Sequence, residues 1–208
     1  GAFADSSSWE GVTRVLLSDG YPVVAAANPL RGLQNDADYV NTVLSSIQGP
    51  IVLVGHSYGG MVITNAVQNN PNVQALVYID AFAPAAGESA FSLSTLYPGS
   101  TLATALAPVA LPDGVTDLYI QQDKFWAQFA ADVPEAETRW MAATQRPVTD
   151  VALNEASGEP AWKTIPSWFI YGDLDLNIPP AAMAFMAERA DAQETVVIPG
   201  ASHVAMIS

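Results

Sequence analysis

Short apolar runs alternate along this chain with stretches in which apolar residues recur at helical spacing. The apolar runs predict β-strands at residues 22–27, 51–55, 74–79, 167–171 and 194–198. Residues 35–48 predict a helix because one face collects Ala37, Val40, Val43, Leu44 and Ile47. Residues 179–190 predict a second helix of the same kind, beginning with two prolines. Such alternation is typical of a mainly parallel α/β sheet with flanking helices.

Residues 84–160 break this alternation. They contain helical pieces at 117–131 and 134–145, separated by prolines, and many aromatic residues. We predict that this segment is an insertion that forms a mostly helical cap over the carboxyl edge of the sheet. Most of its aromatic residues are expected to be ordinary core, and the remainder to line a pocket. The chain is then a single domain, with a core of residues 1–83 and 161–208.

Composition narrows the possible ligands. The chain has 208 residues, of which 50% are hydrophobic, and its net charge of −14 disfavours nucleic acid and anionic membranes as partners. It has no cysteine and only two histidines, which leaves little for a metal site. No apolar run reaches the roughly 18 to 20 residues of a membrane span. We expect a soluble, cytoplasmic protein without a cofactor or metal, and the oligomeric state stays open.

The strand predicted at 51–55 runs directly into Gly55-His56-Ser57-Tyr58-Gly59, which has the G-x-S-x-G pattern of a nucleophile elbow. A sharp strand-to-helix turn would lift the Ser57 hydroxyl clear of the backbone, where a base can activate it. Gly55 and Gly59 are expected to let the strand and the following helix approach without Cβ clashes, and Gly60 to add further room. Ser57 is therefore the candidate nucleophile.

Two histidines and three aspartates are candidates for the partners of this serine. His203 follows the last predicted strand and is the candidate base, whereas His56 adjoins Ser57 in the turn and is assigned to structural support. An orienting carboxylate should lie between the serine and the histidine in chain order. Position in the chain admits Asp80, Asp173 and Asp175, and spacing alone does not separate the last two.

Two longer motifs give the chain a specific resemblance. Residues 172–179 match G-x-x-D-x-x-I-P, and residues 200–208 match G-A-x-H-x-x-M-x-S. In these motifs the chain resembles an α/β-hydrolase of the branch that contains plant methyl esterases, hydroxynitrile lyases and bacterial esterases. The resemblance implies that Asp175 is the acid and His203 the base. It also implies oxyanion-hole N–H donors at Tyr58 and Ala2, since Gly1-Ala2 resembles the end of the His-Gly-Ala oxyanion loop.

The same resemblance predicts what lies outside the given residues. The histidine of the oxyanion loop and the strand before it are absent from the sequence, as is the helix that follows the catalytic histidine in family members. We therefore expect an internal piece of a larger hydrolase. The absent strand would lie between the strands predicted at 22–27 and 51–55, which would leave a gap there.

The expected reaction is hydrolysis of a small carboxylic ester through an acyl-enzyme. Hydroxynitrile lyase chemistry is less expected, because the plant lyases have a lysine where this chain has Val204 and a threonine where it has Gly1. Perhydrolysis, C–C bond hydrolysis and a non-catalytic ligand-binding receptor are further alternatives. For substrate contact the candidates are Phe3, Phe82 and Trp126, with Trp126 expected to wall an apolar pocket over Ser57.

Overall fold

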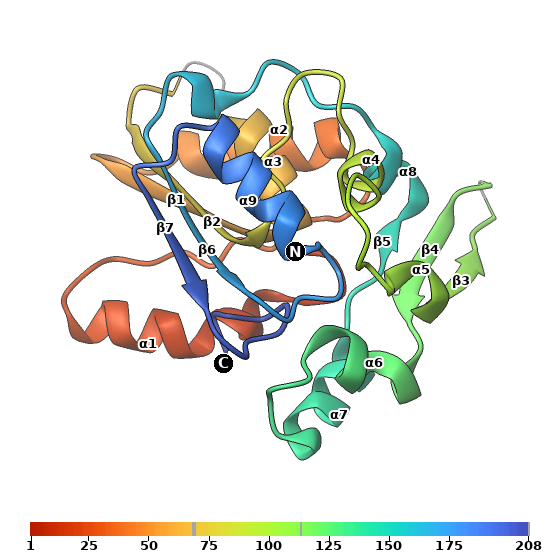
Figure 1. The fold of residues 1–208 in the computed structure, drawn as a ribbon. Coiled ribbons are helices and arrows are strands. Elements are labelled where there is room, and N and C mark those ends of the chain that lie inside the picture. Colours follow the sequence, from red (N-terminus) through yellow and green to blue (C-terminus); the bar gives the residue numbers. More distant parts are fainter. Residues whose placement is uncertain (68–69, 113, 208) are drawn as a thin grey trace.

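A four-stranded, fully parallel sheet forms the centre of the molecule. The computed structural model describes residues 1–67, 70–112 and 114–207. The strands are β1 (Ile51–Ser57), β2 (Val73–Ala81), β6 (Ser167–Gly172) and β7 (Glu194–Ile198), in the order β1-β2-β6-β7. All three neighbouring pairs are parallel, so the carboxyl ends of the strands meet at one edge (Figure 1). Four of the five predicted strands are thereby confirmed.

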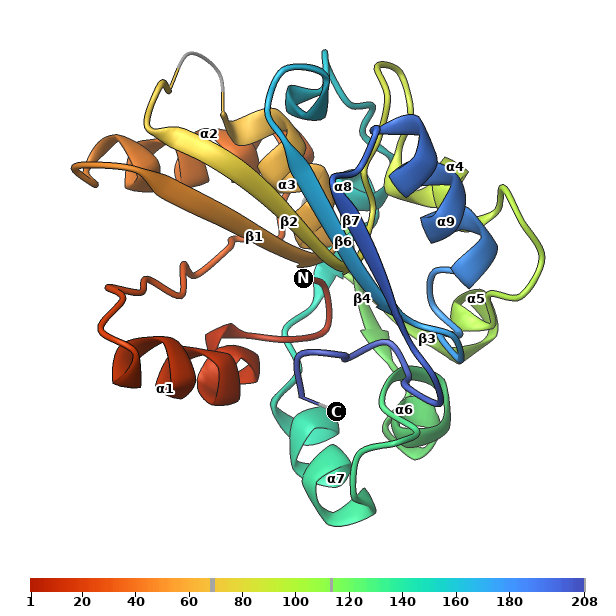
Figure 2. The same ribbon diagram turned by 60° about the vertical axis from the view of Figure 1, so that its left-hand side comes forward.

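Helices cover the two faces of the sheet unequally. On one face lie α2 (Leu33–Ser45), α3 (Tyr58–Ala66) and α9 (Pro180–Arg189) (Figure 2). They bury the strand residues that point toward them, among them Leu76, Tyr78 and Phe169. On the other side, α1 (Glu10–Ser18) follows the short helix η1 (Ser6–Trp9) and buries none of its residues. The predicted helices at 35–48 and 179–190 correspond to α2 and α9.

The strand predicted at 22–27 is wrong. This segment forms no ladder with another strand in the part of the chain that the structure describes, and most of its residues are exposed. Its apolar, β-branched composition favours extended backbone, but a β-strand also needs a neighbour to take its N–H and C=O groups. Within the described residues, β1 pairs only with β2, and its outward Val52 is 62% exposed.

The regular structure of the insertion at 84–160 is mostly helical, as predicted, but it also contains short strands that the sequence did not predict. A small antiparallel sheet joins β3 (Leu106–Ala110), β4 (Thr116–Ile120) and β5 (Val148–Thr149). The predicted helix at 117–131 is therefore divided, because residues 116–120, which include β-favouring threonine, tyrosine and isoleucine, pair with β3. The helices are α4 (Ala90–Ser94), α5 (Leu102–Ala105), α6 (Gln122–Phe129), α7 (Glu135–Thr144) and α8 (Asp150–Asn154), and η2 (Ala161–Lys163) follows the insertion.

Polar contacts fasten the insertion to the start of α2. Arg31 Nη1 lies 2.6 Å from Asp117 Oδ1 on β4, and the Thr149 N–H donates to the Leu30 carbonyl at 3.1 Å. The Glu155 carboxylate accepts the N–H of Leu33 at the first turn of α2. These bonds attach β4, β5 and the end of α8 to the core. Helices α6 and α7 lie at the carboxyl edge of the main sheet, where the insertion was predicted to lie (Figure 1).

Two glycines allow β1, α3 and the segment after β2 to pack without Cβ atoms between them. A Cβ added at Gly55 would lie 2.7 Å from the Gly59 carbonyl oxygen, and one added at Gly60 would lie 2.1 Å from the Phe82 carbonyl oxygen. At Gly59 the nearest atom would be the Gly1 nitrogen at 3.8 Å, an ordinary van der Waals distance. The prediction that a glycine is needed for close packing is confirmed at Gly55. The second glycine that packing requires is Gly60, and not Gly59 as predicted.

This difference predicts opposite outcomes for two neighbouring substitutions. Gly60→Ala should lower the free energy of unfolding by at least about 1–3 kcal/mol, because backbone atoms must move to admit the methyl group. Gly59→Ala should be neutral or stabilising by about 0.5–1 kcal/mol, as is usual for this change within a helix. Urea unfolding of the two variants measures both values. Equal destabilisation by the two substitutions would contradict the packing described.

Candidate active site

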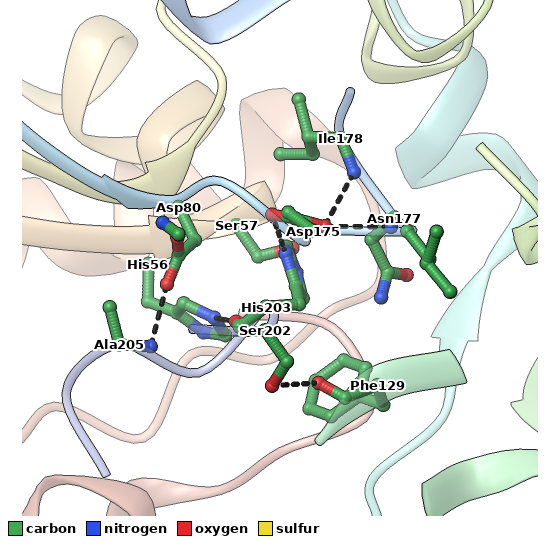
Figure 3. A network of polar contacts seen from close by, with 12 residues as sticks. His56, Ser57, Asp80, Phe129, Asp175, Asn177, Ile178, Ser202, His203 and Ala205 are labelled. Atoms are coloured by element: carbon green, nitrogen blue, oxygen red, sulfur yellow. Dashed lines mark hydrogen bonds and ion pairs between the residues drawn. The ribbon is translucent and has the colours of Figure 1, made fainter. Parts of the chain in front are cut away.

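Ser57 is the last residue of β1 and lies at the turn into α3. Its backbone angles, φ 54° and ψ −126°, are in a region that non-glycine residues rarely adopt. Such strain is found at functional turns that the surrounding structure enforces. The side chain is only 6% exposed, and its Oγ lies 2.8 Å from His203 Nε2 (Figure 3).

His203 and Asp175 complete a hydrogen-bonded series with Ser57. His203 lies in the loop after β7, and its Nδ1 is 2.6 Å from Asp175 Oδ2 in the loop after β6. The other carboxylate oxygen, Oδ1, accepts the N–H groups of Asn177 at 2.7 Å and Ile178 at 3.0 Å. Both oxygens of Asp175 are therefore engaged, one by the histidine and one by the backbone that orients the carboxylate (Figure 3).

The other two candidate acids have different partners. Asp80 accepts the Gly172 N–H at 2.8 Å through Oδ1 and the Ala205 N–H at 2.7 Å through Oδ2. Asp173 accepts the Gly200 N–H at 2.7 Å in an exposed turn. Of the three aspartates that sequence position admitted, the structure brings Asp175 to His203.

Asp80 is a buried carboxylate close to this series. Burial raises its pKa to about 6, and the negative charge of Asp175 acts in the same direction. A protonated His203 and the two backbone N–H donors act in the opposite direction without reversing the shift in the pKa of Asp80. Asp80 lies near the end of β2, and its carboxylate connects the end of β6 to the segment after His203. It therefore supports both the loop that contains Asp175 and the loop that contains His203.

His56 has the structural role predicted for it. Its Nε2–H donates to the His203 carbonyl oxygen at 2.7 Å, which holds the main chain of that residue. The ring also packs edge-on against Trp9 and Phe129 at centroid distances of 6.5 and 6.3 Å. Burial holds the pKa of His56 well below its usual value, and protonation of the nearby His203 would lower it further, so the His56 ring is neutral.

Both predicted oxyanion donors lie beside Ser57. Tyr58 is the first residue of α3, a position whose N–H has no partner within the helix. Its side chain points elsewhere, since the hydroxyl donates to Asp36 Oδ2 at 2.9 Å. The segment carrying Ala2 passes directly against the serine, because a Cβ added at Gly1 would lie 2.8 Å from Ser57 Cβ. Their role as an oxyanion hole remains a prediction.

The three aromatic candidates are placed differently from one another. Phe82 is buried and its N–H donates to the Ser57 carbonyl oxygen at 3.3 Å, while Phe3 is buried next to Ala2. Trp126 is 44% exposed, and its indole N–H donates to the Val133 carbonyl oxygen at 3.2 Å. The structure therefore brings Phe3 and Phe82 to the site, but not Trp126.

Phe129 is the aromatic residue from α6 that does reach the site. Its ring centroid lies 5.1 Å from that of His203 and 6.2 Å from that of Phe3, both edge-on. Sequence reasoning missed this residue, although Phe125 and Phe129 share one helix face by their spacing of four. That face is buried, whereas Trp126 lies outside it.

The described residues contain neither a metal-binding cluster nor a membrane-spanning helix. Within residues 1–67, 70–112 and 114–207, no group of three or more histidine or acidic side chains is arranged to hold a metal ion. None of the helices in these ranges combines the length and the apolar character that crossing a bilayer requires. Ser208, the last position of the second sequence motif, lies outside the described residues.

Comparison with known proteins identifies related sequences. The model of the alpha/beta hydrolase family matches residues 1–208. A carbendazim hydrolyzing esterase from Nocardioides sp. (strain SG-4G) is 38% identical over 87 residues, which cover 39% of this chain and 31% of that esterase. The match to this curated relative thus spans about a third of the relative's length.

Several solved structures share the fold. Polyneuridine aldehyde esterase gives a TM-score of 0.83 at 18% identity, covering 100% of this chain and 91% of that one. A methylesterase from Arabidopsis gives 0.81 at 16% identity, covering 99% and 89%. A pyrethroid hydrolase from Sphingobium faniae JZ-2 gives 0.73 at 21% identity, covering 100% and 89%. At these identities the similarity shows a common fold.

The raised pKa of Asp80 predicts a pH-dependent contribution to stability. Between about pH 4 and pH 6 the folded state should bind more protons at this carboxyl than the unfolded state does, so stability falls as the pH rises through that window. The unfolding free energy of the wild type minus that of Asp80→Asn should therefore decrease by up to about 3 kcal/mol across it. Urea unfolding at several pH values measures the difference. A difference that is independent of pH would contradict the prediction.

Proposed function

Because the chain belongs to the alpha/beta hydrolase family, we propose that it hydrolyses small carboxylic esters through an acyl-enzyme, with Ser57, His203 and Asp175 as the catalytic triad. One observation carries the proposal. A strained serine at the end of a parallel strand is hydrogen-bonded to a buried histidine, which is hydrogen-bonded in turn to a buried carboxylate. The related proteins described above, which include esterases and a pyrethroid hydrolase, support an ester as the substrate.

In the first half of the reaction, Ser57 Oγ attacks the ester carbonyl carbon while its proton passes to His203 Nε2. Asp175 Oδ2 accepts the Nδ1–H, which keeps Nε2 free to take that proton, and its charge stabilises the imidazolium that forms. Collapse of the tetrahedral intermediate breaks the bond to the alkoxy group. The histidine returns its proton to this oxygen, and the alcohol leaves.

In the second half, water is the nucleophile. His203 takes one proton from water as the oxygen attacks the acyl carbon, and it returns the proton to Ser57 Oγ as the carboxylic acid leaves. In both halves the negative oxygen of the intermediate is stabilised by the N–H groups of Tyr58 and Ala2. One such preorganised donor contributes about 10²- to 10³-fold to the rate in other hydrolases.

The surroundings of Ser57 favour compact, apolar substrates. The serine is nearly enclosed. The backbone of buried Phe82 is hydrogen-bonded to it, and the buried ring of Phe129 packs against both His203 and Phe3. An enclosed site excludes bulk water and strengthens the hydrogen bonds to the oxyanion. Long triglycerides, whose three chains need an open face, should be poor substrates.

The residue after His203 separates ester hydrolysis from cyanohydrin cleavage. Val204 is fully buried at this position and carries no charge. A departing cyanide would need a cation near it, and an apolar side chain does not provide one. We therefore propose ester hydrolysis and not cyanohydrin cleavage.

A panel of aryl and alkyl esters with short and long acyl chains tests this function. We expect turnover of the short esters, and a loss of at least about 10³-fold in kcat for Ser57→Ala. Because the substitution removes one hydroxyl, circular dichroism should show an unchanged fold. Undiminished hydrolysis by Ser57→Ala, or faster hydrolysis of long triglycerides than of short esters, would contradict the proposal.

The identity of the acid is tested separately. Asp175→Asn should lower kcat by about 10⁴-fold, because an amide stabilises the wrong tautomer of the histidine. Asp173→Asn is the matched control two residues away. It should leave kcat within a few-fold of the wild type, since the Asp173 carboxylate accepts its hydrogen bond from Gly200 in an exposed turn. Steady-state kinetics on one short ester measures both. A severe loss of kcat in Asp173→Asn with a mild one in Asp175→Asn would refute Asp175 as the acid. A severe loss in Asp80→Asn alone would refute it as well.

A further inference from the structure

One short segment of the insertion contacts both loops that carry the proposed acid and base. The segment consists of residues 128–132, at the end of α6 and just beyond it, and we name it the brace. We propose that the brace aligns Asp175 and His203 for catalysis, with Gln128 and Asp132 as positioning residues. This inference rests on the proposed function of the triad. It assigns the insertion a role in the geometry of the reaction, beyond covering the site.

Gln128 holds the loop that contains Asp175. Its side-chain N–H donates to the Leu176 carbonyl oxygen at 3.2 Å. Its own Oε1 and carbonyl oxygen accept from the Asn177 side-chain amide at 3.3 and 3.2 Å. Gln128 therefore binds the two residues that follow Asp175, and the N–H of Asn177 in turn reaches the Asp175 carboxylate.

The other end of the brace holds the loop that contains His203. Ser202, the residue before the histidine, is buried and its hydroxyl is hydrogen-bonded to the Asp132 carboxylate. The same hydroxyl lies 3.4 Å from the Phe129 carbonyl oxygen. The Phe129 ring then packs edge-on against the His203 ring. Figure 3 shows Phe129 and Ser202 next to each other below His203.

The chemistry of these contacts points to alignment. Gln128 is 6% exposed and Asn177 is 3% exposed, so each buries an amide where an apolar side chain could fill the same space. A buried amide that is fully hydrogen-bonded fixes the relative positions of its partners more narrowly than apolar contacts do. The acid and the base lie on separate loops, and a shift of about 1 Å between catalytic groups can lower a rate by about 10²-fold.

The first test replaces the buried amide by a side chain of similar length. Gln128→Met should lower kcat by about 10- to 100-fold with KM within about three-fold, because the acid is misplaced while the substrate site is not. Gln122→Met is the matched control, since Gln122 is exposed on the same helix. Its kinetic constants should equal those of the wild type. A wild-type kcat for Gln128→Met would overturn the inference for this residue.

A double-mutant cycle separates alignment from general weakening of the fold. If Gln128 acts through Asp175, Gln128→Met should lower kcat by less than about three-fold in an Asp175→Asn background, although the loss of thermal stability stays the same in both backgrounds. If Gln128 has only a structural role, the two reductions in kcat should multiply. The multiplicative result would overturn the inference.

The histidine loop supplies a second variant that should fold. Ser202→Ala removes one hydroxyl and should lower kcat without changing KM, as should Asp132→Ala. Asp132→Asn should restore most of the activity, since its amide oxygen can still accept from Ser202. Equal losses of kcat in Asp132→Asn and Asp132→Ala would overturn the inference for Asp132.

Failure of the proposed function can be distinguished from failure of the brace. If the proposed function is wrong, Ser57→Ala retains ester hydrolysis. If the brace alone is wrong, Ser57→Ala is inactive, and the brace variants have the kcat of the wild type.

Discussion

The hydrogen bond between Ser57 Oγ and His203 Nε2, 2.8 Å long, joins two residues 146 positions apart and depends on most of the fold. The serine is presented by a strained turn that Gly55 and Gly60 allow to pack closely against its neighbours. The histidine lies in a loop whose main chain is held by His56 on one side and Asp80 on the other. A parallel sheet brings these parts to one edge, because all its strands end there.

The insertion belongs to the same arrangement. Its anchoring contacts at the start of α2, through Asp117, Thr149 and Glu155, hold it to the core independently of the site. Its brace then meets the acid loop through Gln128 and the histidine loop through Asp132. Substrate enclosure and alignment of the proposed triad would thus be coupled, and a change in the insertion should alter the reaction rate as well as substrate preference.

The sequence predicted the parts of the site that are determined by local pattern. The Gly-rich turn around Ser57, and the place of His203 after the last strand, follow from strand signals and motif spacing. Features that depend on neighbours distant in the chain were missed. Residues 22–27 have a strand composition but find no partner strand among the residues that the structure describes. Residues 116–120 form a strand because β3 lies beside them. The sequence also pointed to Trp126 as the aromatic residue of the insertion at the site. The packing of α6 places Phe129 against His203 instead.

The reactivity of Ser57 toward a fluorophosphonate tests the central claim most directly, because only an activated serine attacks the phosphorus and displaces fluoride. Mass spectrometry of the intact protein and its peptides should find one phosphonyl group per molecule, on Ser57. The modification should be abolished in Ser57→Ala and greatly slowed in His203→Ala. A protein that stays unmodified, or one modified at another residue while Ser57 is free, would contradict the account.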